Sequence, residues 1–432
     1  MGPGETIVAL SSGQPPSGVA VIRLSGPATA EIVLAIAGKL PKPRHLTLLP
    51  IGTDTVLDRG LVAYFPAPHS FTGEDCAELQ VHGSPAGVRA ILRLVTGQGA
   101  RLAEAGEFTR RAFENGKLDL VEVEGLGDLI EAETENQRRQ ALARFEGGLT
   151  QRIDSWRDQL LDLRAEIEAR LDFSDEGDVA EALPASFGQQ IIALRNDVAA
   201  GLASVEHGRI VREGIRVALA GVPNAGKSSL LNALAKSDIA IVTDEAGTTR
   251  DVREVPVDIG GQLFIFLDLA GLRDTDSKAE AEGVRRARHE IERADLVLWL
   301  QAPDVEDDIP PVTGMPMWLV ATKTDLAVDT ELHDLAVSVR SGHGLDQLTA
   351  RLTEFARQLG GGGEPSLLSR ERDRLALEAA VIALDDAGER LAEPELAAEA
   401  LRLASQALER LLGRLDAERV LDRLFVSFCI GK

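Results

Sequence analysis

A glycine-rich loop between an apolar run and a helical stretch constrains this chain more than any other feature. The loop reads Gly-Val-Pro-Asn-Ala-Gly-Lys-Ser over residues 221–228, directly after the apolar run 217–220. In a strand–loop–helix context, this spacing lets backbone N–H groups and the helix N-terminus surround a polyphosphate. We expect Lys227 to reach the terminal phosphates and the Ser228 hydroxyl to bind Mg²⁺. The sequence therefore predicts a phosphate-binding loop on an α/β sheet.

The composition excludes several classes of protein. The chain has 432 residues, enough for about two to four domains. It has no apolar run of the roughly 18 residues that span a bilayer, and no basic segment followed by an apolar core at its start. The two cysteines, Cys76 and Cys429, do not make a disulfide framework. We expect a cytoplasmic protein without membrane contact, with Cys76 in the core and Cys429 either reactive or buried.

The net charge of −23 argues against binding of nucleic acid over most of the surface. Neutralising phosphates requires clustered Lys and Arg. Any contact with RNA must therefore come from a local basic patch or from a partner protein.

The pattern of apolar residues changes several times along the chain. Strand-like runs alternate with helical patterns near the start, amphipathic helices follow, and apolar strand-length runs alternate with helices after Gly214. We predict a multidomain protein with an α+β N-terminal domain, an all-α helical domain, and a doubly wound α/β P-loop GTPase domain inserted into the helical domain. The predicted boundaries are 1–116 for the α+β domain, 117–211 and 360–432 for the two parts of the helical domain, and 212–359 for the inserted domain.

Two segments after the loop suit binding of the phosphates and the metal. Asp268-Leu-Ala-Gly271 is expected to hold Mg²⁺ through water with its Asp and to meet the γ-phosphate with its Gly N–H. The threonine-rich segment 243–251 lies between these motifs. A threonine there that binds Mg²⁺ only while the γ-phosphate is present is the physical basis of a nucleotide switch.

A carboxylate at Asp325 predicts a preference for GTP over ATP. It can accept hydrogen bonds from guanine N1–H and the 2-amino group, and adenine lacks this pair of donors. Thr322 occupies the usual Asn position, and its hydroxyl can still brace the phosphate loop. Ser338-Val-Arg340 is expected to be the second base-contacting loop. The predicted GTP-binding residues are Asn224, Ala225, Gly226, Lys227, Ser228, Ser229, Thr243, Thr248, Thr249, Asp268, Leu269, Ala270, Gly271, Thr322, Lys323, Asp325 and Ser338.

The hydrolytic group is not evident from the motifs. The position after Asp-x-x-Gly is Leu272, which cannot orient water as a Gln does in switch GTPases. Arg250 and Arg273 are candidate arginine fingers. The alternative is a carboxylate with a monovalent cation, and the acidic stretch offers Asp274, Asp276, Glu280 and Glu282.

Motifs over the whole chain resemble those of the MnmE (TrmE) family of bacterial tRNA-modification GTPases. In the α/β part they cover residues 221–229, 247–251 and 268–273. In the N-terminal part they cover 21–26, 71–75, 107–113 and 117–120, and the chain ends in Phe-Cys-Ile-Gly-Lys, residues 428–432. The sequence departs from the family pattern at Gln14-Pro-Pro-Ser-Gly18, Leu269, Thr322 and Val339.

The resemblance implies a cation-assisted hydrolysis. Members of the family are homodimers through the N-terminal domain, and their GTPase domains meet around K⁺, which acts like an arginine finger. The matching K⁺ ligands are Asn224, Thr243, Glu245 and Thr248. The water-orienting carboxylate is Glu280, twelve residues after Asp268. The implied catalytic residues are thus Glu280, Thr249 and Lys227, with Mg²⁺ on Ser228 and Thr249. The alternatives are a turn-forming Asn224 and a solvated Glu280.

The resemblance also implies a tetrahydrofolate site at Arg23, Glu78, Lys117 and Lys432. Arg and Lys suit the glutamate carboxylates of a folate, and Glu78 suits the pterin N–H donors. A surface ion pair is the alternative at each position.

The implied function is the formation, with the flavoprotein MnmG (GidA), of an aminomethyl or carboxymethylaminomethyl group at C5 of the tRNA wobble uridine. The assembly is expected to be a heterotetramer, with FAD on the partner only and tRNA contacted mainly by the partner. Two rivals are a switch GTPase without modification chemistry and a folate-dependent transferase with a vestigial nucleotide site. Folate binding tests the first rival, and GTP turnover tests the second.

Overall fold

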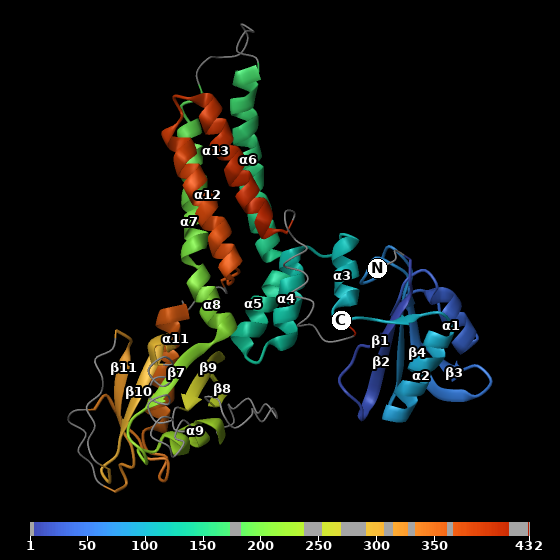
Figure 1. The fold of residues 1–432 in the computed structure, drawn as a ribbon, viewed down its shortest axis with the longest axis horizontal. Helices are drawn as coiled ribbons and strands as arrows, with labels where there is room; N and C mark the ends of the chain where they lie inside the picture. Colours follow the sequence, from blue (N-terminus) through green and yellow to red (C-terminus); the bar gives the residue numbers. More distant parts are fainter. Residues whose placement is uncertain are drawn as a thin grey trace, which may run out of the picture. The chain divides into compact units, whose positions relative to one another are not determined.

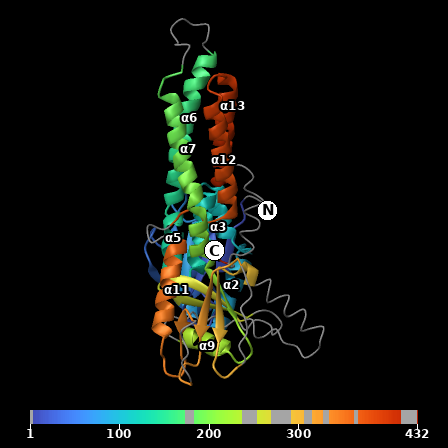
Figure 2. The ribbon, with the colours of Figure 1, turned by 90° about the vertical axis from the view of Figure 1, so that its left-hand side faces the viewer.

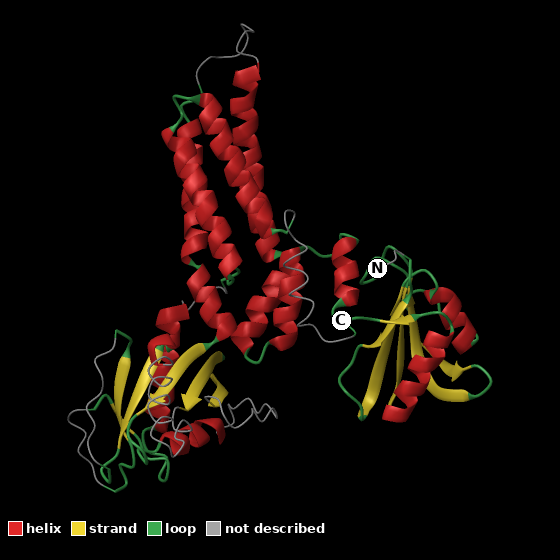
Figure 3. Cartoon of the chain, in the orientation of Figure 1, coloured by secondary structure: helices red, strands yellow, loops and turns green. Residues whose placement is uncertain are grey.

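The computed structural model describes residues 4–172, 183–236, 253–268, 291–305, 314–326, 333–360, 366–413 and 431. The chain forms two compact units, one of Met1–Gly127 with Leu408–Lys432 and one of Asp128–Ala407. Figure 3 shows the first as a sheet with helices and the second as a helical array that carries its own sheet. No helix in the described ranges is long and apolar enough to cross a membrane.

The first unit contains a six-stranded sheet in the order β3-β4-β5-β2-β1-β6. Its neighbouring strands are antiparallel except β1 and β6, which are parallel. The strands are β1 (Ile7–Leu10), β2 (Ser17–Ser25), β3 (Thr47–Gly52), β4 (Val56–Phe65), β5 (Cys76–Gly83) and β6 (Arg101–Leu102). The helices are α1 (Thr29–Ala37), α2 (Pro85–Gly97) and α3 (Glu107–Glu114), seen in Figure 1.

Alternation along β1 shows why this sheet has helices on both faces. Val8 belongs to the core formed with α1 and α2, whereas Ile7 and Ala9 pack with Phe108 of α3. Successive strand side chains point to opposite faces. The sheet is therefore covered by α1 and α2 on one face and by α3 on part of the other.

The second unit contains a sheet in the order β12-β11-β10-β7-β9-β8, parallel except for the antiparallel β8–β9 pair. Leucines of α9 and α11 pack on one face, and Ile291 and Ala294 pack on the other. This is a doubly wound α/β sheet with both faces covered. Its elements are β7 (Ile215–Ala220), α9 (Lys227–Lys236), β8 (Arg253–Ile259), β9 (Gln262–Asp268), β10 (Leu296–Gln301), β11 (Met317–Ala321), β12 (Leu335–Ala336) and α11 (Leu345–Gly360).

Helices that precede the inserted sheet in the sequence pack with helices that follow it. Trp156 of α6 is fully buried and donates from Nε1 to Asp197 of α7 at 2.7 Å. Arg195 of α7 pairs with Asp385 of α12 at 2.9 Å, and α6, α7, α12 and α13 lie side by side in Figures 1 and 2. The helices are α4 (Leu120–Glu131), α5 (Glu135–Phe145), α6 (Gly148–Asp172), α7 (Phe187–Ala203), α8 (Val205–Glu213), α12 (Glu371–Glu389) and α13 (Pro394–Leu411).

The chain passes from the helices into the inserted sheet near Gly208 and returns near Ser366, and these two connections, called the chain crossings below, lie next to each other. Gln140 of α5 donates from Nε2 to the carbonyls of Gly208 (3.1 Å) and Ser366 (2.7 Å), one on each crossing. A Cβ on Gly208 would lie 1.9 Å from the Leu368 carbonyl oxygen, so only glycine permits this approach. Beside it the buried Arg144 pairs with Asp373 at 3.4 Å.

The predicted fold class is confirmed, and the boundaries at 116, 211 and 359 stay predictions. The sequence reading missed four strands. Two of them, β3 and β8, are edge strands that contain Pro50 and Pro256, and proline is tolerated at sheet edges but masks a strand pattern. The other two, β6 and β12, have only two residues each. Helix α1 ends at Ala37, where Gly38 adopts φ 69°.

Candidate nucleotide site

The phosphate-binding loop joins β7 to α9 through three residues with positive φ. Gly221 has φ 124°, Asn224 63° and Gly226 92°. A Cβ on Gly221 would lie 2.3 Å from the Leu300 carbonyl oxygen. The first glycine is therefore required by close approach to β10, and asparagine is among the few other residues that tolerate a left-handed turn.

The Lys227 side chain points back into this loop. Its Nζ donates to the carbonyls of Gly221 (2.7 Å) and Val222 (2.8 Å), and the residue is only 8% exposed. A buried ammonium that is held by backbone carbonyls is preorganised for the oxygens of a phosphate.

The two described residues expected near Mg²⁺ are in direct contact. Ser228 Oγ donates to Asp268 Oδ2 at 2.9 Å. Asp268 is the last residue of β9 and lies opposite Leu219 of β7. A hydroxyl and a carboxylate side by side fit a hard cation that binds oxygen and keeps several waters.

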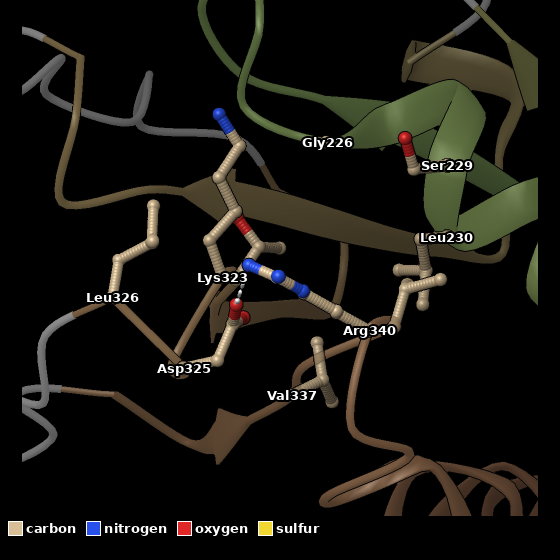
Figure 4. Close-up of a pocket in the computed structure, with 10 residues that line it drawn as sticks. Gly226, Ser229, Leu230, Lys323, Asp325, Leu326, Val337 and Arg340 are labelled. Atoms are coloured by element: carbon tan, nitrogen blue, oxygen red, sulfur yellow. Dashed lines mark ion pairs between the residues drawn. The ribbon is translucent and has the colours of Figure 1, made fainter.

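A pocket of about 340 Å³ continues from the loop toward the end of β11, and Figure 4 shows its lining. Ser338 Oγ donates to Asp325 Oδ1 at 2.6 Å, and this bond holds the pKa of the Asp325 carboxyl below its usual range. Asp325 Oδ2 faces the exposed guanidinium of Arg340 at 3.9 Å. The pocket is lined by Gly226, Ser229, Leu230, Thr322, Lys323, Asp325, Leu326, Val337, Val339 and Arg340.

Thr322 connects this pocket to the phosphate loop. Its buried hydroxyl donates to the Ala225 carbonyl at 2.7 Å, which confirms that a threonine here reaches the loop. The Gln301 carbonyl lies 3.0 Å from the same oxygen. A hydroxyl has one proton, so Thr322 braces one carbonyl at a time where a side-chain amide offers two protons.

Sequence reasoning missed Leu230, Leu326 and Val337 of the pocket lining, and Asp304 beside the pocket. The predicted Lys323 adopts φ 51°, and its Nζ pairs with Asp304 at 2.7 Å, after the end of β10. The apolar wall includes Leu230 and Val337. Leu230 was open to detection because it follows Gly226 by one helical turn, which places both on one side of the loop. Nothing local marked Asp304.

Several predicted site residues lie outside the described residues. They are Thr243, Glu245, Thr248 and Thr249 between α9 and β8, Leu269, Ala270, Gly271 and Glu280 after β9, Lys432 at the chain end, and the unassigned candidates Arg250, Leu272, Arg273, Asp274, Asp276, Glu282 and Cys429.

In the first unit, the sheet register brings two of the predicted folate residues together. Arg23 of β2 lies opposite Glu78 of β5, and its guanidinium donates to Oε1 at 2.8 and 3.1 Å. Both side chains are 23% exposed. The guanidinium also lies over the rings of Phe71 and Phe108, at 5.3 and 5.8 Å. The two side chains therefore lie side by side on the sheet and are both partly exposed.

Lys117 contacts the loop that carries Phe71. Its Nζ donates to the Pro68 carbonyl at 3.2 Å, and its stem lies against Gly73. Cys76 is buried as expected, and its Sγ lies 3.1 Å from Thr72 Oγ1.

The inserted α/β part of the second unit is a P-loop nucleotide-binding domain. Its mostly parallel sheet carries a phosphate loop with a hydroxyl and a carboxylate beside it, and Asp325 is oriented in the adjoining pocket. The family model of the MnmE helical domain matches residues 120–429, and that of the GTP-binding protein TrmE N-terminus matches residues 6–117. The chain belongs to the MnmE (TrmE) family.

Close relatives match along almost the full chain. The tRNA modification GTPase MnmE of Azorhizobium caulinodans is 50% identical over 437 residues, with 99% of each chain covered. Those of Sinorhizobium medicae and Rhizobium johnstonii are 50% and 48% identical, again with 99% of each chain covered. Among solved structures, the G domain of the T. maritima FeoB iron transporter is 27% identical over 33% of this chain and 98% of its own, with a TM-score of 0.25.

Proposed function

We propose that this protein hydrolyses GTP as part of tRNA modification. The curated relatives that match it end to end are named tRNA modification GTPases. The observation that carries the proposal is the Asp325 carboxylate, which Ser338 orients in a pocket that also includes Gly226 of the phosphate loop and Ser229 of α9.

This arrangement favours guanine chemically. The ionised carboxylate accepts from guanine N1–H and the 2-amino group, and adenine leaves it without donors. The apolar side chains of Leu230 and Val337 line the same pocket and would contact a planar base. Thr322 ties the base pocket to the phosphate loop, so a base that fits places the phosphates beside Lys227.

At the phosphates, the chain supplies positioning and charge. With a nucleotide bound, Lys227 would exchange its loop carbonyls for terminal phosphate oxygens, and Ser228, Thr249 and the neighbouring Asp268 would hold Mg²⁺. Bound Mg²⁺ supplies neutralisation of the β and γ oxygens. Positioning and electrostatic stabilisation account for most of the catalysis of phosphoryl transfer.

For hydrolysis we propose that Glu280 orients the attacking water and that Asn224, Thr243, Glu245 and Thr248 hold K⁺. K⁺ supplies the positive charge that an arginine finger supplies elsewhere. The position of Asn224 in the phosphate loop supports this role. Its φ of 63° gives the asparagine a conformational reason as well, so a test has to separate the side chain from the backbone.

The experiment is GTP hydrolysis at matched ionic strength in KCl and in NaCl. The Asn224→Gly variant keeps the positive φ and removes the side-chain oxygen, and Asn224→Ala serves as the strained comparison. Strong K⁺ stimulation that both variants lose supports the cation site. Equal rates in the two salts would sink it and turn attention to Arg250 and Arg273. No GTP turnover in either salt would remove the proposed activity.

We also propose that Glu78 accepts the pterin donors of a tetrahydrofolate one-carbon donor, and that Lys117 and Lys432 bind its glutamate carboxylates. The pairing with Arg23 supports a role for that arginine in holding Glu78 for the pterin. Calorimetry with 5-formyltetrahydrofolate tests this, since Glu78→Gln should abolish binding and Glu31→Gln should not. Undiminished binding by the Glu78→Gln variant would contradict it. GTP turnover without folate binding would favour a switch GTPase.

For partners we propose a homodimer through the N-terminal domain and a heterotetramer with the flavoprotein MnmG in the cytoplasm. The flavoprotein carries FAD and most of the tRNA contact, and the product is the aminomethyl-type group at C5 of the wobble uridine. Leu48 and Leu61 support the homodimer, because they lie opposite each other at the sheet edge and are 65% and 38% exposed. Sedimentation of Leu48→Asp tests it, and a wild-type monomer would contradict it.

A further inference from the structure

The net charge of the chain is distributed unevenly. Residues 1–116 contain ten acidic and ten basic residues, so the rest of the chain carries the whole net charge of −23. A polyanion is repelled by a strongly acidic surface and is attracted only where cations cluster. The neutral N-terminal segment is therefore where the backbone of a nucleic acid meets the least repulsion from this chain.

Cations in that segment gather on the loop that joins α1 to β3, two elements labelled in Figure 1. Residues 32–53 contain no acidic residue. The loop residues Lys39, Lys42, Arg44 and His45 are all exposed, as is His69 of the adjoining loop. We name these five residues the basic patch.

Arg44 is held in place by contacts from three directions. Its φ of 63° is uncommon for a residue other than glycine. Its amide donates to the Tyr64 carbonyl at 2.9 Å, its guanidinium donates to the His69 carbonyl, and the same group lies 6.0 Å from the centre of the Phe65 ring. A strained conformation persists where its surroundings fix it, often at functional sites.

The lysines and Arg44 of the patch differ from most cations of the second unit. There, arginines pair with acidic residues on their own helices, as in Arg209–Glu206 and Arg402–Glu399. Within the described ranges, no carboxylate lies at ion-pair distance from the patch. The neighbouring Asp75 is occupied by the Tyr64 hydroxyl and the Ala67 amide.

We propose that the basic patch contacts the phosphate backbone of the tRNA substrate. The proposal rests on the proposed role in tRNA modification and adds a contact made by this chain to those of the partner protein. Lys and Arg contacts to phosphates position a nucleic acid without reading its sequence. The patch is also preorganised, because Pro41, Pro43, Pro66 and Pro68 fix φ around it.

The test is fluorescence anisotropy of a labelled, unmodified tRNA transcript titrated with the full chain at about 50 mM salt and above. We expect wild-type affinity in the weak range of roughly 10⁻⁴ to 10⁻⁶ M. Lys39→Glu with Lys42→Glu should weaken binding about tenfold or more and lower the salt slope by about one to two. Neither lysine side chain has a hydrogen bond or an ion pair within the described residues. The control, Arg89→Glu with Arg93→Glu, makes the same charge change on exposed residues of α2 and should bind as wild type does.

Three results would overturn the proposal. The first is that the wild type does not bind tRNA at low salt, and the second is that the patch and control variants weaken tRNA binding equally. The third is that the patch variant binds tRNA as the wild type does but selectively loses affinity for triglutamyl over monoglutamyl tetrahydrofolate. The last result would assign the patch to a folate tail. GTP turnover in KCl, measured on the same proteins, is expected to be unchanged. Its absence in the wild type would instead count against the proposed function.

Discussion

The nucleotide site and the Arg23–Glu78 site are built by different means. Residues of the nucleotide site follow strand ends, and their positions depend on local backbone conformations such as φ 124° at Gly221. Arg23 and Glu78 are fifty-five residues apart and meet only because β2 and β5 pair in one register. A site of the first kind is readable from spacing, whereas a site of the second kind depends on a sheet that spacing does not specify.

The largest effect is expected at Asp325. Asp325→Asn removes the acceptor that matches both guanine donors, so affinity for GDP should fall roughly a thousandfold. Isothermal titration measures it, with Asp346→Asn as a control that removes an exposed carboxylate of α11 outside the pocket. A tenfold or smaller loss would mean that the pocket reads the base by other groups.

A smaller effect is expected at Tyr64, in the first unit. Burial, and then the hydrogen bond to Asp75, raises the pKa of Tyr64 to about 12. The folded state keeps this proton longer than the unfolded state, whose pKa is near 10. The free energy of unfolding should therefore fall as pH rises from about 10 to 12, by at most about 3 kcal/mol.

Urea unfolding between pH 9 and 12 measures that slope. Tyr64→Phe should flatten it, whereas a substitution of an exposed residue such as His82→Asn should not. An identical slope in the Tyr64→Phe variant would show that other groups govern the alkaline response.

A further test compares two ways of bracing the phosphate loop. Thr322→Val keeps the shape and removes the hydroxyl bond to the Ala225 carbonyl, so affinity for GTP should fall about tenfold. Thr322→Asn should bind GTP at least as tightly as the wild type because an amide has two protons. Equal affinities for all three proteins, measured by displacement of a fluorescent guanine nucleotide, would show that this position does not support the loop.

The smallest effect is expected for the register-built pair. A double-mutant cycle of Arg23→Ala and Glu78→Ala should give a coupling energy of about 1 kcal/mol, since both groups are partly exposed. Denaturant unfolding measures it, and Arg101→Ala with Glu78→Ala is the uncoupled comparison. A coupling energy near zero would show that the ion pair does not stabilise the fold, although the strand register brings the two side chains together.

The contrast explains what the sequence could predict. The strand–loop–helix of the phosphate loop and the strands before Asp268 and Thr322 follow from local patterns. Edge strands with Pro50 and Pro256 do not, because their pairing depends on neighbours that lie far along the chain. The pairing of Asp304 with Lys323 and that of Arg23 with Glu78 are likewise products of tertiary structure, although the resemblance had singled out Arg23 and Glu78 separately.

The Gln140 side chain, which contacts both chain crossings, shows how the nucleotide-binding domain is inserted into the helical domain. One amide group reaches the carbonyls of Gly208 and Ser366, although 158 positions separate them in the sequence. Two points so close can be joined by a short peptide. In its topology, the nucleotide-binding domain is thus an insertion with adjacent ends. The helical domain could gain or lose it with little change to the connections between its helices.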